Sequence, residues 1–357
     1  MATIIDPQFQ AEVKALPNDI DKMLVFCTKK NCSDLFITVG KPAAIYRYGI
    51  VYYTTKKTDT IAWNNFTSKA ITSEMNTKYV RTKMLDFQYT VDKFRYRVNA
   101  SYSMGANIAT FRMLSERLPS FSSLNIDDNV AALMERAFSA KTGVTMLCGV
   151  TGSGKTSTLA AAINTFTNGN INRNLPLKDG HLITLEDPIE YVYPSTQNTL
   201  IQQKELGNDF KAFDLGVKSA LREHPTHILV GETRDNETIK SLIEATVTGH
   251  LCLTTFHAGD VAETISRLFS HLVNDNQDVM FDLINCFNFI LCQELIKGRG
   301  GYTLNYQYLF FNETIKQFLI KAIYEGKNIP DTVNALMHNK KLLESGLAAD
   351  WKYQRKK

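Results

Sequence analysis

Residues 149–156 have the types and spacing of a loop that binds phosphate. They read G-V-T-G-S-G-K-T, and the glycines let the backbone curl so that its N–H groups point at phosphate oxygens. We expect Lys155 to reach the β- and γ-phosphates of a nucleotide and the Thr156 hydroxyl to bind Mg²⁺. The predicted nucleotide-binding residues are Gly149, Val150, Thr151, Gly152, Ser153, Gly154, Lys155, Thr156 and Ser157.

Such a loop needs a strand before it and a helix after it, and the flanking residues supply both. Val144 to Cys148 is an apolar run typical of a buried strand, and Ser157 to Phe166 has a helical pattern. The N-terminus of that helix adds partial positive charge beside the phosphates. An ordinary glycine-rich turn would not explain a Lys-Thr pair at this offset, so the sequence predicts a nucleotide site.

Two acidic residues follow other predicted strands. Glu186 comes directly after Leu182–Leu185, and Glu232 comes shortly after His227–Val230. The carboxyl ends of parallel strands face the ligand crevice, so we expect Glu186 to orient or deprotonate water and Glu232 to support Mg²⁺. The alternative, capping of the following helix, applies chiefly to Asp187 and Asp235.

A further predicted strand, Leu251–Phe256, has a histidine at each end, His250 and His257. No cysteine–carboxylate set accompanies them, so we expect them to sense phosphate rather than to bind zinc. The alternative for each is a structural hydrogen bond, which is the interpretation we favour for His224 and His227.

Length and composition indicate a globular protein with room for two domains. The chain has 357 residues, of which 44% are hydrophobic and 21% charged, and its net charge of +4 does not by itself indicate nucleic-acid binding. Six scattered cysteines without a C-x-x-C pair are expected to be free, buried thiols of a reducing compartment. We expect no secretory signal, because the N-terminus lacks a basic region followed by a long apolar core. We also expect no integral membrane segment, because acidic and amide residues interrupt the longest apolar stretch, Val279–Cys292.

The pattern along the chain predicts a small α+β domain over residues 1–115, a linker over 116–125 and a larger α/β domain over 126–357. In the first domain, Ala44–Tyr53 is predicted to be one strand. In the second, helical stretches are expected over Val279–Ile296, a strand pair near Tyr302–Phe311, and helices from Thr314 to Ala348.

Four motifs together resemble the ATPases of type II and type IV secretion and of pilus retraction. They occur in the family's order and roughly its spacing, and Gly231 stands where many P-loop enzymes have an aspartate. The chain is most similar to the type IVB branch, the DotB/TraJ-like ATPases. The motifs are the phosphate loop, the acidic box Ile183–Tyr191, the segment Leu229–Asp235 and the histidine box Thr248–Ala258.

Two segments depart from the family pattern. Gln293–Ile296 places an acid, Glu294, where the family has a basic or apolar residue, and Glu313–Leu319 lacks the A-I-R-N motif of the retraction ATPases. The second departure favours secretion or conjugation over pilus retraction.

The resemblance also implies a role for arginines of the first domain. In the family, arginines on these strands reach a nucleotide, often that of the adjacent subunit, which corresponds here to Arg95, Arg97 and Arg112. On the residues alone, Arg95 and Arg97 share one strand face, and a solvated face is the alternative.

The resemblance implies a homohexamer. Each subunit would have a PAS-like N-terminal domain and a RecA-like domain, and ATP with Mg²⁺ would be bound between these two domains. His250 and His257 would report the γ-phosphate, and the domains would move about a hinge near Pro119. We expect a cytoplasmic motor, recruited peripherally to the inner membrane by secretion-system components and other cytoplasmic ATPases, which needs no nucleic acid. The alternatives are a type IV pilus retraction ATPase, a RecA-like nucleic-acid translocase and a catalytically inactive ATP-binding scaffold.

Overall fold

The computed structural model describes residues 6–114, 117–168, 180–272, 277–298 and 301–349. The chain divides into two compact units, Met1–Arg117 and Leu118–Lys357. In the described part of the chain, no helix has the length and hydrophobicity needed to cross a membrane. All six cysteines are free and buried, as the sequence predicts.

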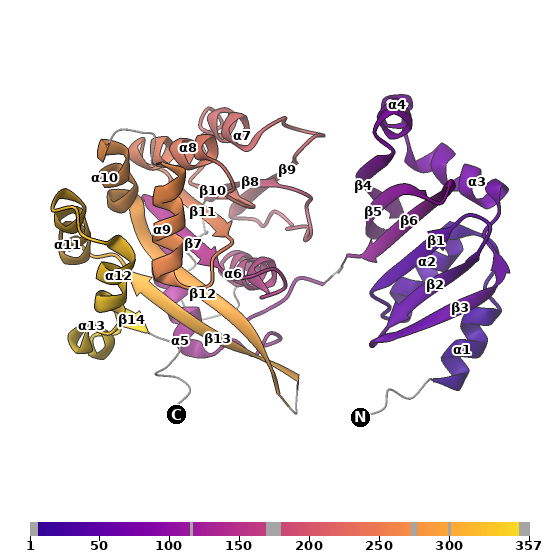
Figure 1. Ribbon diagram of the computed structural model, residues 1–357, viewed down its shortest axis with the longest axis horizontal. Coiled ribbons are helices and arrows are strands. Elements are labelled where there is room, and N and C mark those ends of the chain that lie inside the picture. The colour runs from indigo at the N-terminus through magenta and orange to yellow at the C-terminus, as the bar shows by residue number, and fades with distance from the viewer. Residues whose placement is uncertain (1–5, 115–116, 169–179, 273–276, 299–300, 350–357) are drawn as a thin grey trace. The chain divides into compact units, whose positions relative to one another are not determined.

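The first unit is an antiparallel sheet covered by helices (Figure 1). Its six strands lie in the order β3-β2-β1-β6-β5-β4, so the central pair joins the first strand to the last. The core contains apolar residues of α1 to α3 and of the strands. The elements are α1 (Pro7–Lys14), α2 (Ile20–Lys29), β1 (Asp34–Thr38), β2 (Pro42–Arg47), β3 (Ile50–Lys57), α3 (Thr60–Ala70), α4 (Ser73–Thr82), β4 (Met84–Val91), β5 (Phe94–Ser103) and β6 (Ala106–Met113).

The second unit contains an eight-stranded sheet in the order β14-β13-β12-β7-β11-β10-β8-β9. The strands from β12 to β9 run parallel, and β13 and β14 continue the sheet antiparallel. The strands are β7 (Gly143–Cys148), β8 (Gly180–Glu186), β9 (Thr199–Glu205), β10 (His227–Val230), β11 (Leu251–Phe256), β12 (Phe287–Gly298), β13 (Gly301–Phe310) and β14 (Ala348–Ala349).

Helices cover both faces of this sheet (Figure 1). One core contains α5 and α6, and the other contains residues of α7 to α12. Burial on two faces explains why β7, β10 and β11, which are buried at every position, are mostly apolar and show no polar–apolar alternation. The helices are α5 (Asp128–Phe138), α6 (Lys155–Asn168), α7 (Phe213–Ala220), α8 (Asn236–Val247), α9 (Val261–His271), α10 (Gln277–Cys286), α11 (Glu313–Tyr324), α12 (Ile329–Met337) and α13 (Lys340–Glu344).

The predicted helix over Val279–Ile296 is wrong in its second half. Helix α10 ends at Cys286, and β12 begins at the next residue between β7 and β13. Phe289 to Cys292 are fully buried, so the strand shows no polar–apolar alternation and cannot be told from a helix by periodicity. The strand pair expected near Tyr302–Phe311 is instead formed by β13 with β12.

The prediction of one strand over Ala44–Tyr53 is also wrong, because a tight turn divides it into β2 and β3. Arg47 pairs with Ile50, which leaves Tyr48 and Gly49 as a two-residue loop. Both have positive φ, 49° and 85°, as a type I′ turn requires. Tyrosine rarely adopts this conformation, so its presence concealed the turn.

Part of the segment predicted as a linker packs on the second unit. Phe121 is 8% exposed and belongs to the core that contains α5 and α6. The carbonyl of Pro119 accepts a hydrogen bond of 2.9 Å from the side-chain amide of Asn164 on α6. The chain is therefore attached to the helix of the phosphate loop directly after it enters the second unit.

Candidate nucleotide site at the carboxyl edge of the second sheet

The phosphate loop connects β7 to α6 and has the backbone that its glycines predict. Gly149, Gly152 and Gly154 have φ values of 151°, 79° and 85°, in a region that side chains rarely enter. A Cβ on Gly149 would lie 2.4 Å from the carbonyl oxygen of Gln293 on β12. At this position glycine is required both by the backbone angle and by the close approach of a neighbouring strand.

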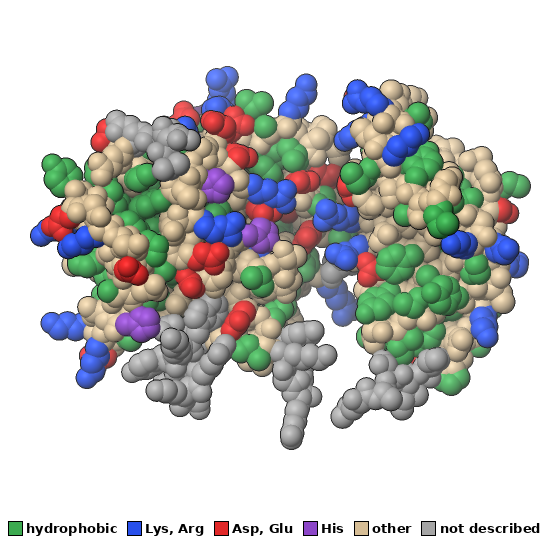
Figure 2. Space-filling model, in the orientation of Figure 1, with side chains coloured by type: hydrophobic (Ala, Val, Ile, Leu, Met, Phe, Trp, Pro, Cys, Tyr) green, Lys and Arg blue, Asp and Glu red, His purple; other side chains and the backbone are tan. Residues whose placement is uncertain are grey.

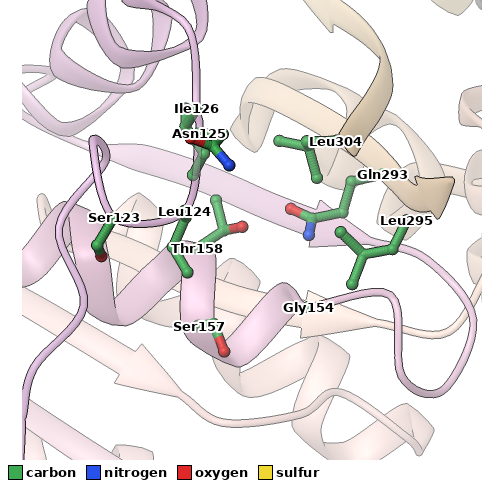
Figure 3. Close-up of a pocket in the computed structure, with 10 residues that line it drawn as sticks. All are labelled: Ser123, Leu124, Asn125, Ile126, Gly154, Ser157, Thr158, Gln293, Leu295 and Leu304. Carbon is green, nitrogen blue, oxygen red and sulfur yellow. The ribbon is translucent and has the colours of Figure 1, made fainter. Parts of the chain in front are cut away.

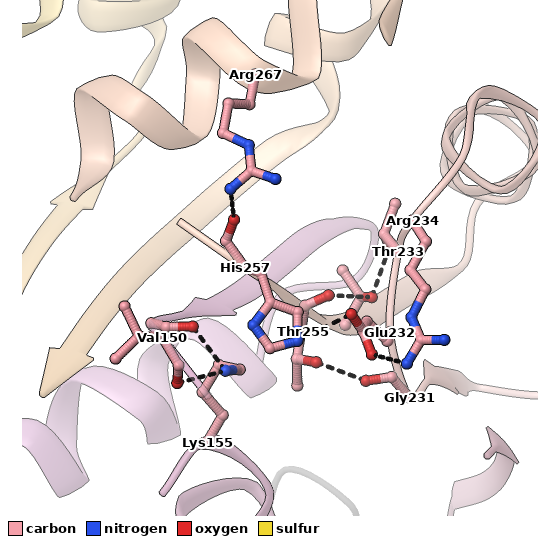
Figure 4. A network of polar contacts seen from close by, with 11 residues as sticks. Val150, Lys155, Gly231, Glu232, Thr233, Arg234, Thr255, His257 and Arg267 are labelled. Carbon is pink, nitrogen blue, oxygen red and sulfur yellow. Dashed lines mark hydrogen bonds and ion pairs between the residues drawn. The ribbon is translucent and has the colours of Figure 1, made fainter. Parts of the chain in front are cut away.

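Lys155 closes over the loop. Its Nζ donates to the carbonyl oxygens of Gly149 at 2.7 Å and Val150 at 3.1 Å (Figure 4). The residue is only 8% exposed. Burial lowers the pKa of the ammonium, because desolvation penalises the charged form, although the nearby Cys148 and Glu232 raise it. A buried cation of this kind gains from a bound anion.

The loop has the properties of an anion cradle. The Ser153 hydroxyl is buried without a hydrogen-bond partner among the described residues, and the loop opens onto the N-terminus of a 14-residue helix. Both features fit a phosphate group. Thr156 stands in the first turn of that helix, where its hydroxyl has the chemistry of a Mg²⁺ ligand. The residues present therefore fit a nucleotide with its magnesium ion.

The parallel sheet brings the predicted catalytic carboxylates to the edge where this loop lies. Strands β7, β11, β10 and β8 are consecutive neighbours, so the residues that follow them share one edge. Gly231 N–H donates to the Leu185 carbonyl at 2.7 Å, and Thr255 Oγ1 donates to the Gly231 carbonyl at 2.6 Å. These contacts join the ends of three strands.

Gly231 allows this close contact between strand ends. A Cβ there would lie 3.1 Å from the Leu185 carbonyl oxygen and 3.3 Å from Cα of Glu186. Any side chain would press on β8 directly beside Glu186. The glycine that replaces the usual aspartate therefore has a packing reason in this chain.

Glu232 lies between two basic groups (Figure 4). Its Oε2 is 2.6 Å from Arg234 and its Oε1 is 3.0 Å from Nε2 of His257. Arg267 on α9 donates to the His257 carbonyl. The hydrogen bond to Glu232 is the main cause of the raised pKa of Arg234. Sequence reasoning missed both arginines, although Arg234 lies two residues from Glu232.

Glu186 is the last residue of β8 and is 6% exposed. Its Oε1 accepts hydrogen bonds from Thr184 Oγ1 at 2.6 Å and from Gln203 Nε2 at 3.0 Å. Gln203 Nε2 also donates to the Tyr191 carbonyl at 2.8 Å. The carboxylate is thus fixed by neighbours on β8 and β9, as a residue that orients water must be.

His250 does not lie with the other residues. It precedes β11, whereas His257 follows it, and six residues at about 3.3 Å each separate the two edges of the sheet by roughly 20 Å. The Nδ1 of His250 is 3.2 Å from the Ala245 carbonyl and 3.3 Å from Thr248 Oγ1. Of these two histidines, His257 lies at the edge that carries the phosphate loop and His250 lies at the opposite edge.

The structural alternatives hold for two other residues. Asp235 caps α8 through a hydrogen bond from the Thr238 N–H to Oδ1 at 2.8 Å. His227 is buried, with Nε2 3.2 Å from the Phe138 carbonyl, and burial lowers its pKa.

The three predicted arginines lie on adjacent strands of the first unit. Arg97 and Arg112 are directly opposite each other across β5 and β6, and both are exposed. Arg112 Nε is 3.1 Å from Asp34 Oδ1, and Arg95 donates to Gln88 at 3.4 Å. Like charges directly opposite each other destabilise a sheet, and Asp34, which faces Arg112 from β1, offsets the charge of one arginine.

A cavity of about 220 Å³ lies beside the phosphate loop within the second unit (Figure 3). It is bordered by the start of α6, by the turn before α5 and by side chains of β12 and β13. The sequence does not predict this cavity, because these segments are far apart along the chain. The lining residues are Ser123, Leu124, Asn125, Ile126, Gly154, Ser157, Thr158, Gln293, Leu295 and Leu304.

Comparison with known families defines the class of this protein. The model of the type II/IV secretion system protein family matches residues 10–302, and the chain belongs to this family. It is 30% identical to the type IV pilus retraction ATPase PilT of Pseudomonas aeruginosa over 292 residues, 79% of each chain. It is 29% identical to the type IV pilus ATPase PilU of the same organism over 79% of this chain and 72% of that one.

Solved structures extend the similarity over both units. The ATPase DotB of Legionella pneumophila matches with a TM-score of 0.77 and 26% identity, covering 99% of this chain and 92% of its own. The pilus retraction motor PilT, solved with bound ADP, matches with a TM-score of 0.75 and 28% identity, covering 89% and 92%. The predicted fold, a RecA-like domain preceded by a smaller α+β domain, is confirmed.

Proposed function

We propose that this ATPase of the type II/IV secretion family is a homohexameric motor of a type IVB secretion or conjugative transfer system. The observation that carries the proposal is the match to DotB, which extends over 99% of the chain and so includes both units. The motor would act in the cytoplasm, recruited to the inner membrane by other components of the machine. Pilus retraction is the second candidate, favoured by the similarity to PilT and PilU.

The residues at the carboxyl edge would divide the reaction between them. The loop amides and Lys155 would hold the phosphates, and Thr156 and Glu232 would hold Mg²⁺, which neutralises charge on the phosphoryl group. Glu186 would orient or deprotonate the attacking water. His257, through its contact with Glu232 at 3.0 Å, would report the state of the site. His250 would act only across an interface, given its position at the other edge.

The attachment of Pro119 to α6 provides a path from the nucleotide to the first unit. Lys155 and Thr156 begin this helix, and Asn164 on the same helix holds the Pro119 carbonyl. A shift of α6 with nucleotide state would therefore displace the segment that leads to the first unit. We propose that this displacement is the hinge motion of the motor.

Assembly and turnover test the proposal together. We expect purified protein to hydrolyse ATP as a particle of hexamer mass, measured by light scattering on the sample used for kinetics. Complementation then separates the two candidate functions. The gene should restore substrate transfer in cells that lack DotB, and it should not restore surface motility in cells that lack PilT. Restored motility alone would favour pilus retraction, and a monomer that binds ATP without turnover, with membranes present, would favour the scaffold.

Replacement of Glu232 by glutamine is expected to lower the rate of hydrolysis at least tenfold while nucleotide binding persists. The amide retains an acceptor for Arg234 but removes the charge that would support Mg²⁺. The measurement is kcat as a function of Mg²⁺ concentration, and the variant should need more metal. Glu237→Gln, on the exposed first turn of α8, is the matched control. Near-normal hydrolysis would mean that another acid supports the metal.

Replacement of Arg112 by glutamine is expected to reduce hydrolysis about tenfold or more without unfolding the protein. The side chain is 66% exposed, so loss of its ion pair should change the free energy of unfolding by less than about 1 kcal/mol. Asp34→Asn removes the negative charge of the partner but keeps the guanidinium, and it should retain more activity than Arg112→Gln. Full activity of Arg112→Gln, with an unchanged melting temperature, would make this arginine dispensable.

The translocase alternative predicts a basic surface with aromatic side chains for stacking. On the face of the second unit in Figure 2, basic and acidic side chains are interspersed. The β2–β3 hairpin of the first unit is rich in tyrosine: Tyr48 and Tyr53 are exposed, whereas Tyr52 is buried in the core. Affinity for single-stranded DNA that falls steeply with salt would support this alternative.

A further inference from the structure

Gln293 on β12 is the most deeply buried polar side chain that lines the cavity beside the phosphate loop. It is 1% exposed, and its Nε2 donates to the Ser153 carbonyl at 2.7 Å. Its Oε1 is also buried, and it accepts no hydrogen bond from any described residue. A buried amide oxygen left unpaired costs free energy, so this atom calls for a partner.

The orientation of the amide is fixed by its neighbour. A carbonyl oxygen only accepts, so the nitrogen of Gln293 must face Ser153. The oxygen is then directed into the cavity, as Figure 3 shows. The cavity therefore presents a hydrogen-bond acceptor beside the loop that would hold the phosphates.

The other walls suit a flat apolar ring. Leu124 and Ile126 come from the turn before α5, and Leu295 and Leu304 come from β12 and β13. Gly154 is also part of the lining, and a Cβ there would lie 3.4 Å from Gln293 Nε2 and 3.5 Å from Leu295. Ser123, Asn125, Ser157 and Thr158 complete the lining. Four aliphatic side chains with a few polar groups among them are the usual form of a site that selects a ligand by its edge.

We infer that Gln293 is a specificity-determining residue, whose Oε1 accepts a hydrogen bond from the 6-amino group of adenine. The inference rests on the proposed function, because it assumes that the loop binds a nucleotide. Adenine carries a donor at position 6, whereas guanine and hypoxanthine carry an oxygen. A 6-oxo purine would place two acceptors face to face in a dry cavity and leave both unpaired.

The experiment compares purine nucleoside diphosphates, which the enzyme cannot hydrolyse. Isothermal titration calorimetry on the full chain should give an IDP dissociation constant about tenfold to a hundredfold above that of ADP. In Gln293→Met, which removes the acceptor at similar volume, the ratio should fall to about one. Loss of the bond to Ser153 weakens all diphosphates alike, so only the ratio reports on the base. Leu295→Met, in the same cavity, should keep the ratio.

A second measurement needs no variant. Purine riboside 5′-diphosphate carries hydrogen at position 6, so it removes the donor without adding an acceptor, and the native chain should bind it more weakly than ADP but no more weakly than IDP. Equal affinity for ADP, IDP and this analogue would overturn the inference. The inference would also be overturned if Gln293→Met kept its preference for ADP over IDP and lost a preference for ADP over 2′-deoxyADP. That result would assign Oε1 to the ribose. If the native chain binds none of these diphosphates, it is the proposed function that fails.

Discussion

Replacement of Lys155 by alanine is expected to abolish nucleotide binding, with at least a hundredfold rise in the dissociation constant of ADP. Lys155 is 8% exposed, and its ammonium is held by the Gly149 and Val150 carbonyls, so the charge is already positioned at the loop before a ligand arrives. Its removal leaves the loop amides and the helix terminus as the positive potential within the loop, and a helix terminus contributes about 0.3–1 kcal/mol to such an interaction. Calorimetric titration with ADP measures the effect.

The loss must be separated from a loss of folding. Lys340→Ala removes a charge from an exposed helical site of the same unit, where the side chain is 87% exposed, and it should leave binding unchanged. The melting temperature of Lys155→Ala without ligand should stay close to that of the native chain, because the lysine forms no part of the hydrophobic core. Unchanged ADP affinity in a folded Lys155→Ala variant would contradict the assignment of the phosphate loop.

The site residues that lie directly after the ends of strands could be predicted from the sequence. The order of β7, β11, β10 and β8 in the sheet brings the phosphate loop, His257, Glu232 and Glu186 to one edge, and this depends only on the strands being parallel. The same rule separates the two histidines, since His250 precedes β11 and His257 follows it. Two residues that flank the same strand in the sequence, one on each side, therefore lie at opposite edges of the sheet.

What could not be predicted depends on pairing between distant segments. β12 reads as a continuation of α10 until β7 is placed beside it, because Phe287 to Cys292 is largely buried on both faces. The cavity with Gln293 exists only where β12 lies beside the phosphate loop. The contacts of Glu186 with Gln203 likewise depend on β9 pairing with β8, where Gln203 lies opposite Thr184. Local pattern carries no information about such neighbours.

Replacement of Glu186 by glutamine is expected to lower kcat by about a hundredfold or more, the usual range for loss of a general base, while ADP affinity stays within about twofold. The substitution tests chemistry rather than folding, because an amide oxygen can still accept from Thr184 and Gln203 at the positions where the carboxylate accepts now. Steady-state hydrolysis and calorimetric binding on the same preparation give the two quantities.

Comparison with two other glutamates decides what the loss means. Glu244→Gln, on an exposed position of α8, should be fully active, which excludes a general effect of charge. Glu232→Gln should recover part of its activity at high Mg²⁺, because it would act through the metal. Glu186→Gln should not recover activity at high Mg²⁺, because added metal cannot replace the carboxylate that activates water. If Glu186→Gln recovered activity at high Mg²⁺, Glu186 and not Glu232 would be the residue that supports the metal. If Glu186→Gln were fully active without added metal, Glu186 would have no part in the reaction.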